Sequence, residues 1–79
     1  MGDLKNHVYY EGVVIGVEQP EEVGEPCILV HGRINDKDAE FYLILDAASY
    51  HEVLRLGIGQ QVSGRGVVES TSPLIVRKI

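Results

Sequence analysis

The sequence is poor in the features that define several large classes of protein. Cys27 is the one cysteine in 79 residues, so no disulfide can form within the chain, and a reducing, cytoplasmic compartment is expected. No apolar run approaches the roughly 18 residues that a membrane-spanning helix needs, and the start of the chain shows no secretory signal. We therefore expect a protein that is not associated with a membrane.

Basic residues are also scarce. The chain has 7 lysines and arginines against 12 aspartates and glutamates, which gives a formal net charge of −5. An acidic chain repels phosphate groups, and this lowers the expectation of nucleic-acid binding unless a local basic face exists. Hydrophobic residues make up 44% of the chain, which is enough for one folded domain with a modest core.

Motifs for catalysis, cofactors and metals are missing. The segment Gly57–Val62 departs from the dinucleotide-binding fingerprint at its last position, and no P-loop is present. Cys27 and His31 are spaced to share one face of a strand, but a structural zinc site needs about four ligands and nothing completes the set. No catalytic triad is recognisable in the sequence. We predict that the chain is not an enzyme and binds no cofactor or metal.

Alternation of apolar and polar residues predicts five strands. In the first of them, Val13, Ile15 and Val17 are expected to share one face, and Gly12 and Gly16 lie on the other, where glycine often marks a bulge or a close approach. The predicted strands are Val8–Val17, Cys27–Ile34, Ala39–Asp46, Gln60–Glu69 and Leu74–Ile79.

One helix is predicted between the third and fourth strands. Ser49 and Glu52 form an S-x-x-E capping box, so Ser49 is expected to be the N-cap. Gly57 is expected to end the helix in a left-handed conformation, and Ile58 to follow as an apolar residue that contacts Val53.

This order of elements predicts an all-β fold, a five-stranded OB-fold Greek-key barrel with one short helix between strands three and four. The segment 19–26 forms a loop after the first strand, and the turn 35–37 joins the second and third strands into a hairpin. An SH3-like barrel is the alternative. Residues 1–7 are expected to be a flexible N-terminus ahead of a single domain that spans 8–79.

The pattern resembles the OB-fold nucleic-acid-binding domains of the anticodon-binding and replication-protein-A type. The resemblance covers about residues 8–79 and lies in core and turn positions of the first, third, fourth and fifth strands. It implies a domain that binds nucleic acid. The matching residues are Gly12, Val13, Val14, Val17, Phe41, Leu43, Leu45, Asp46, Gly59, Val62, Gly64, Gly66, Val68, Leu74, Val76 and Ile79.

In such a barrel the ligand lies across the exposed face of strands two and three. The sequence places His31, Arg33, Tyr42 and Ile44 on that face, and Arg65 can join them from the fourth strand. A tyrosine can stack on a base, and an arginine can pair with phosphate. We therefore predict weak binding of single-stranded nucleic acid, with stacking on Tyr42 and with Arg33 and Arg65 at the backbone. Further candidates for the same face are Leu29, Tyr9 and Tyr10.

A protein-interaction or oligomerisation module is the alternative function. The net charge is negative, the first loop is acidic, and apolar residues accompany the polar ones on the expected binding face. The partner would be a basic protein or a second copy of the chain. Arginines 33, 65 and 77 gathered on one face would favour nucleic acid, whereas scattered arginines around an apolar patch would favour protein. The acidic residues of the loop are Glu18, Glu21, Glu22 and Glu25.

Overall fold

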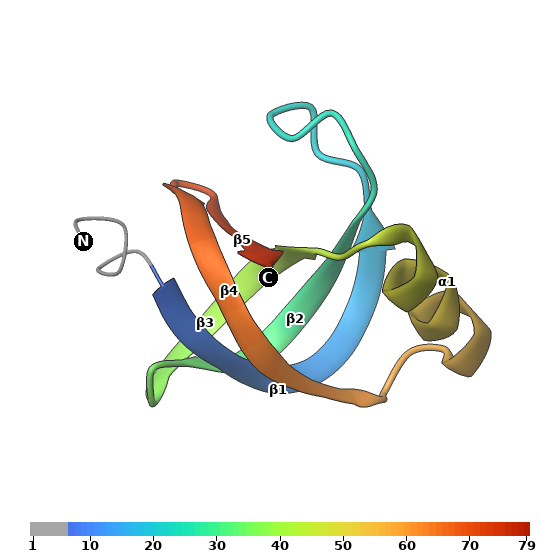
Figure 1. The fold of residues 1–79 in the computed structure, drawn as a ribbon, viewed down its shortest axis with the longest axis horizontal. Coiled ribbons are helices and arrows are strands. Elements are labelled where there is room, and N and C mark those ends of the chain that lie inside the picture. The colour runs from blue at the N-terminus through green and yellow to red at the C-terminus, as the bar shows by residue number, and fades with distance from the viewer. Residues whose placement is uncertain (1–6) are drawn as a thin grey trace.

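The computed structural model describes residues 7–79, in which five strands close into a barrel in the order β1-β2-β3-β5-β4 (Figure 1). Strands β3 and β5 pair in parallel, and every other neighbouring pair is antiparallel. With a helix between β3 and β4, this is the arrangement of an OB-fold, and the predicted fold class is confirmed. The elements are β1 (His7–Glu18), β2 (Cys27–Ile34), β3 (Lys37–Ile44), α1 (Ala47–Leu56), β4 (Gln61–Thr71) and β5 (Leu74–Lys78).

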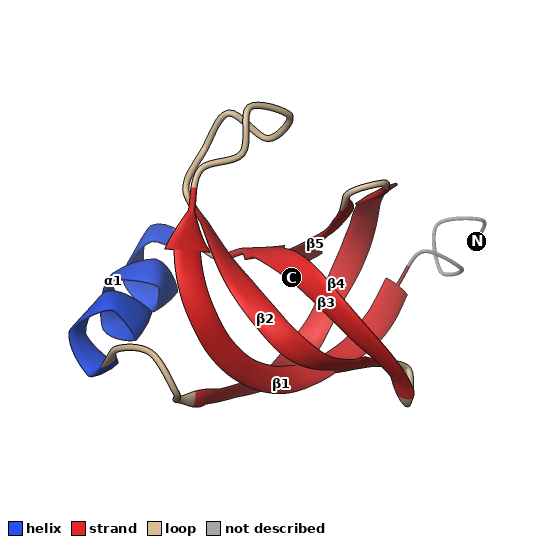
Figure 2. Ribbon diagram, turned by 180° about the vertical axis from the view of Figure 1, so that it is seen from behind, coloured by secondary structure: helices blue, strands red, loops and turns tan. Residues whose placement is uncertain are grey.

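The predicted flexible segment, 1–7, lies almost wholly outside the described residues. Its last member, His7, begins β1 and pairs with Val67 of β4. The helix α1 lies beside one end of the barrel, and the β2–β3 turn lies at the far side from it (Figures 1 and 2). The loop between β1 and β2 projects beyond the strands at a third corner (Figure 2).

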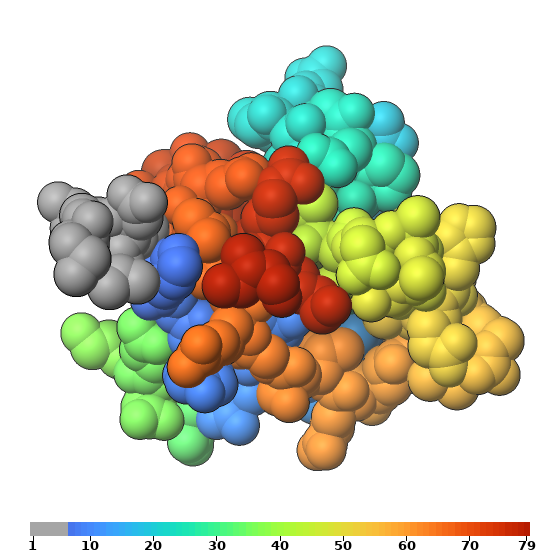
Figure 3. Space-filling view, viewed as in Figure 1, coloured from blue at the N-terminus to red at the C-terminus, as the bar shows by residue number. Residues whose placement is uncertain are grey.

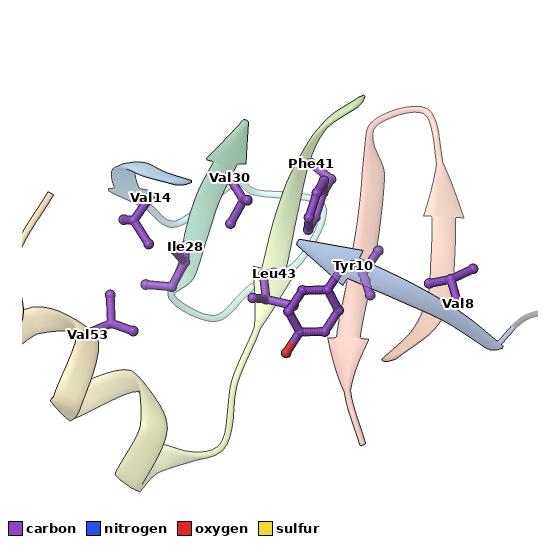
Figure 4. Close-up of a cluster of buried hydrophobic side chains, with 9 residues drawn as sticks. Val8, Tyr10, Val14, Ile28, Val30, Phe41, Leu43 and Val53 are labelled. Carbon is purple, nitrogen blue, oxygen red and sulfur yellow. The ribbon is translucent and has the colours of Figure 1, made fainter. Parts of the chain in front are cut away.

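A cluster of buried apolar side chains fills the barrel (Figure 4). All five strands and the helix contribute to it or pack against it, so apolar packing supports every element in addition to backbone pairing. Within it the ring of Tyr10 meets the ring of Phe41 edge-on at a centroid distance of 6.1 Å. The buried members are Val8, Tyr10, Val14, Ile28, Val30, Phe41, Leu43, Val53 and Val76.

The prediction that Val13, Ile15 and Val17 share one face of β1 is wrong. Val13 lies opposite the exposed His31, whereas Val17 lies opposite the fully buried Ile28. The register between β1 and β2 shifts between Val14 and Gly16, which is a β-bulge. Because a bulge inserts one residue into the period of two, the inward and outward positions exchange at that point.

The close approach of β1 and β2 explains one pair of glycines. Gly12 and Gly32 lie directly opposite each other. A Cβ on Gly32 would collide with the backbone carbonyl of Glu11, and a Cβ on Gly12 would lie 2.6 Å from a methyl carbon of Val30. Only glycine at both positions lets the two strands pack at this distance.

The start of α1 differs from the predicted capping box. Asp46, not Ser49, is the N-cap: its carboxylate accepts hydrogen bonds from the Ser49 backbone N–H at 3.1 Å and from the Ser49 hydroxyl at 2.8 Å. Strand β3 ends at Ile44, so Asp46 is free to adopt the extended N-cap conformation, and the helix starts earlier in the chain than expected. Glu52 instead pairs with Arg55, one turn further along.

Gly57 ends α1 as predicted, but its ψ of −176° is not that of the predicted left-handed conformation. Gly57 has a φ of 91°, and its N–H donates to the Val53 carbonyl at 2.8 Å. Val53 is the buried residue of the helix, and Ile58, the predicted apolar partner, is 64% exposed. After the helix the chain returns to β1, where the Gly59 N–H donates a hydrogen bond to the Val14 carbonyl at 2.8 Å.

Candidate ligand-binding face

The outer surface of β1, β2 and β3 carries two rows of polar side chains. In one row Arg33 of β2 lies between Glu11 of β1 and Asp38 of β3. In the next row His31 lies between Val13 and Glu40. Directly opposite residues on antiparallel strands point to the same side with Cβ atoms about 5 Å apart, so each row is a line of neighbours. We call these six residues the acidic face.

Carboxylates outnumber guanidinium groups on the acidic face. Glu11, Asp38 and Glu40 are exposed, and Arg33 brings the one side chain that is always cationic. The Arg33 Nε lies 3.7 Å from an oxygen of Asp38, and both side chains are more than half exposed. The face is therefore negative, although it contains the arginine and the histidine that the sequence placed there.

Tyr42 reaches toward the β1–β2 loop rather than standing free on the acidic face. Its hydroxyl donates to a carboxylate oxygen of Glu18 at 3.3 Å, and its ring packs partly against a second buried cluster of Cys27, Ile44 and Ile75. The Glu18 carboxylate, more than burial, raises the pKa of Tyr42. A base stacking on this ring would have to lie beside an anionic loop.

The prediction that Ile44 lies on the exposed binding face is wrong. It is 2% exposed and belongs to the second cluster. Strand β5 pairs with β3 from Tyr42 to Ile44, and the loop residue Val23 packs on the same cluster. The end of β3 is thus covered from two sides, which alternation along one strand could not reveal.

The β1–β2 loop is fastened to the barrel by Arg77 of β5. The guanidinium of Arg77 donates to Glu25 of the loop at 2.9 Å and to Glu69 of β4 at 2.7 Å. These hydrogen bonds, with that to Glu69 the larger cause, raise the pKa of Arg77 above its usual value. Because two carboxylates engage it, Arg77 holds the loop and brings no free positive charge to the acidic face.

Arg65 lies elsewhere, against Tyr9. The guanidinium carbon is 5.2 Å from the centre of the Tyr9 ring, a cation–π contact, and Tyr9 is 61% exposed. Among residues 7–79, no carboxylate lies within ion-pair distance of Arg65. Of the two tyrosines that the sequence could not separate, Tyr9 faces outward, and Tyr10 is 3% exposed in the core.

Two small clefts flank Tyr9. One of about 370 Å³ is bordered by Arg33, and one of about 220 Å³ is bordered by Arg65. Asn35 borders both: its side-chain oxygen accepts from the Tyr9 N–H at 2.9 Å, and its own N–H donates to the Tyr9 carbonyl at 2.9 Å. The sequence predicted Asn35 only as a turn residue, and it has a positive φ of 50°, which asparagine tolerates in tight turns.

No protein-family model, curated protein or solved structure matches this chain. In the part of the chain that the structure describes, no three His, Cys, Asp or Glu side chains gather as metal ligands would. The described helix α1 is too short and too polar to cross a membrane.

Proposed function

We propose that the barrel is a non-catalytic protein-binding module, and that its partner presents a cationic, extended segment to the acidic face. One observation carries the proposal: Glu11, Asp38 and Glu40 surround the single arginine of that face. Charge complementarity of this kind sets the choice of partner and speeds association. The glutamates of the β1–β2 loop extend the negative field beyond the strands.

Apolar contacts support an extended partner. Val13 is 36% exposed on the acidic face, and Leu29 is half-buried in the next row, opposite Tyr42. An extended segment projects every second side chain to one side, so lysines or arginines at some of these positions would meet the carboxylates, and apolar residues at others would meet these two.

Single-stranded nucleic acid is the second candidate, and the observation in its favour is the Tyr9–Arg65 pair. An exposed aromatic ring flanked by two arginines is a stacking platform with phosphate partners beside it. Arg33 and Arg65 keep the roles expected from the sequence, and Tyr9 replaces Tyr42 as the stacking residue. Arg77 takes no part, so the three arginines do not form the cluster that would have favoured nucleic acid.

A fluorescence-anisotropy titration with three labelled probes separates the two functions. The probes are an octapeptide in which lysine and valine take turns at every second position with serines between them, its glutamate–valine counterpart, and oligo(dT). We expect saturable binding of the lysine peptide that weakens with salt, and none of the glutamate peptide. Replacing Glu11 and Glu40 by glutamine should weaken binding about fivefold. Glu52→Gln on α1 removes a like charge away from the acidic face and should change nothing.

Other outcomes contradict the proposal. Saturable binding of oligo(dT) that Tyr9→Ala abolishes, with no binding of the lysine peptide, would establish the nucleic-acid function instead. Equal binding of both peptides would show that the carboxylates of the acidic face play no part.

A further inference from the structure

A separate hollow lies between α1 and the strands β4 and β5, and we call it the α1–β4 cleft. Its volume is about 520 Å³, within the roughly 300–1,000 Å³ of sites that bind small molecules. Figure 3 shows the surface hollowed between the yellow-green start of α1 and the red C-terminal residues. Residues that line it include Tyr10, Leu45, Ser49, Val53, Val62 and Lys78.

The hydroxyl of Tyr10 opens into this cleft. Tyr10 is 3% exposed, and its ring crosses Gly64, where a Cβ would lie 2.9 Å from the hydroxyl oxygen. Figure 4 shows the hydroxyl directed away from Phe41. Among residues 7–79 the Tyr10 hydroxyl makes no hydrogen bond. Every fully enclosed side-chain nitrogen or oxygen atom of these residues does make one, so the Tyr10 hydroxyl is not fully enclosed and reaches the open cleft. A buried phenol normally finds a hydrogen-bond partner, and here the cleft is where that partner would sit.

The charges beside the cleft are already paired. Asp46 accepts from the Lys78 ammonium at 3.3 Å and from Ser49. Burial first, and then the Asp46 carboxylate, raises the pKa of Tyr10, so its hydroxyl keeps its proton at neutral pH and is able to donate. Glu52, which pairs with Arg55, lines the cleft, so this carboxylate and the nearby Asp46 would repel an anionic ligand but not a neutral acceptor.

We propose that the α1–β4 cleft binds a small, neutral, largely apolar molecule with a carbonyl oxygen. The oxygen accepts a hydrogen bond from the Tyr10 hydroxyl, and Leu45, Val53 and Val62 surround the apolar part. The cleft adjoins the acidic face, since Ser63 lines the cleft and lies opposite Glu11, but it contains none of the six residues of that face and does not depend on the proposed protein partner.

The test is an NMR titration of the ¹⁵N-labelled full chain with N,N-dimethylbenzamide. We expect saturable shifts confined to the amides that border the cleft, among them Ser49, Val53 and Val62. Cumene lacks the oxygen and benzoate carries a charge, and both should bind more weakly. Tyr10→Phe keeps the ring and removes the hydroxyl, which should weaken binding about three- to tenfold.

A second variant guards against a folding effect of the core substitution. Ala48 is exposed at the start of α1 and borders the cleft, so Ala48→Phe fills the space without touching the core, and it should abolish binding. Thr71→Phe, which introduces the same ring at the exposed end of β4, should leave binding unchanged. Three outcomes would each overturn the proposal. They are shifts outside the cleft, an affinity equal to that of the wild type in the Tyr10→Phe and Ala48→Phe variants, and no binding at millimolar concentrations of N,N-dimethylbenzamide.

Discussion

Among single residues, Asp46 joins two elements that are distant in the sequence. It caps α1 through Ser49 and pairs with Lys78 of β5, so the helix start and the last strand share one carboxylate. The hydrogen bonds from Ser49, and secondarily Lys78, lower the pKa of Asp46 from 3.8 to about 2. A carboxyl whose pKa falls on folding stabilises the fold above its unfolded pKa, and this contribution disappears as the pH falls through the folded value.

Replacing Asp46 by alanine should therefore lower the midpoint of thermal unfolding at neutral pH by several degrees. The Asp46→Asn variant keeps a capping oxygen and loses the charge, so its midpoint should lie between those of the alanine variant and the wild type. The difference between wild type and Asp46→Asn should shrink between about pH 4 and pH 2. Thermal unfolding followed by circular dichroism across this range checks the expectation, and a constant difference down to pH 2 would contradict it.

Gly32 gives a second prediction at the residue scale. A Cβ there meets the backbone of β1, which cannot move without breaking the β1–β2 ladder, so Gly32→Ala should cost about 3 kcal/mol or more in urea unfolding. Gly16→Ala is the matched control on the facing strand. Its nearest neighbour would be the Leu29 Cβ at 3.9 Å, an ordinary contact, and we expect a change below about 1 kcal/mol. Equal losses in both variants would show that strand propensity, not close packing, governs Gly32.

Among the elements, the β1–β2 loop depends on one side chain. Arg77 joins Glu25 to Glu69, and Cys27, which donates its thiol to the Glu25 carbonyl, is fully buried beneath the loop. Arg77→Met should loosen the loop and raise the rate at which DTNB labels Cys27 in the native protein by several-fold.

The direction of this change is informative because the chemistry alone would oppose it. Burial, then Glu25, raises the pKa of Cys27, and Arg77 lowers it, so losing Arg77 leaves less reactive thiolate at a given pH. A faster reaction must then come from opening of the loop. Arg55→Met on α1 removes another paired arginine and should leave the rate unchanged. A rate equal to or below that of the wild type would show that the apolar cluster of Cys27, Ile44 and Ile75 alone holds the loop.

The sequence predicted elements better than it predicted faces. The end of α1 follows from Gly57, whose positive φ needs no tertiary contact, and the alternation in β2 and β4 agrees with the burial of both strands. The faces of β1 were missed because the bulge after Val14 depends on pairing with β2. Ile44 was misplaced because β5, the last strand of the chain, covers it. Such contacts are not encoded in the period of a single strand.

Across the whole molecule, the distribution of charge decides more than its sum. The arginines that suggested nucleic acid are present, but Arg33 faces Asp38, and Arg77 faces Glu25 and Glu69. The register between two strands decides which carboxylate lies opposite which arginine, and the order of residues within one strand does not reveal that register. His31 and Arg33 lie on the outer surface of the barrel as expected, while the negative potential of that surface emerged only from the folded barrel.

Because carboxylates oppose Arg33 on the acidic face, we predict that this face repels nucleic acid. Neutralising Glu11, Asp38 and Glu40 as Gln, Asn and Gln changes the net charge from −5 to −2 and leaves Arg33 without its opposing carboxylates. This triple variant should lose binding of the lysine–valine peptide and gain measurable, salt-sensitive binding of oligo(dT).

Neutralising Glu21, Glu22 and Glu52 as glutamines gives the same net charge of −2 while the acidic face stays intact. If the total charge governed binding, both triple variants would gain oligo(dT) equally. At moderate salt, electrostatic interactions are screened beyond about 10 Å, so we expect only the variant with the neutralised acidic face to gain oligo(dT) binding. Parallel anisotropy titrations of the two variants measure the difference.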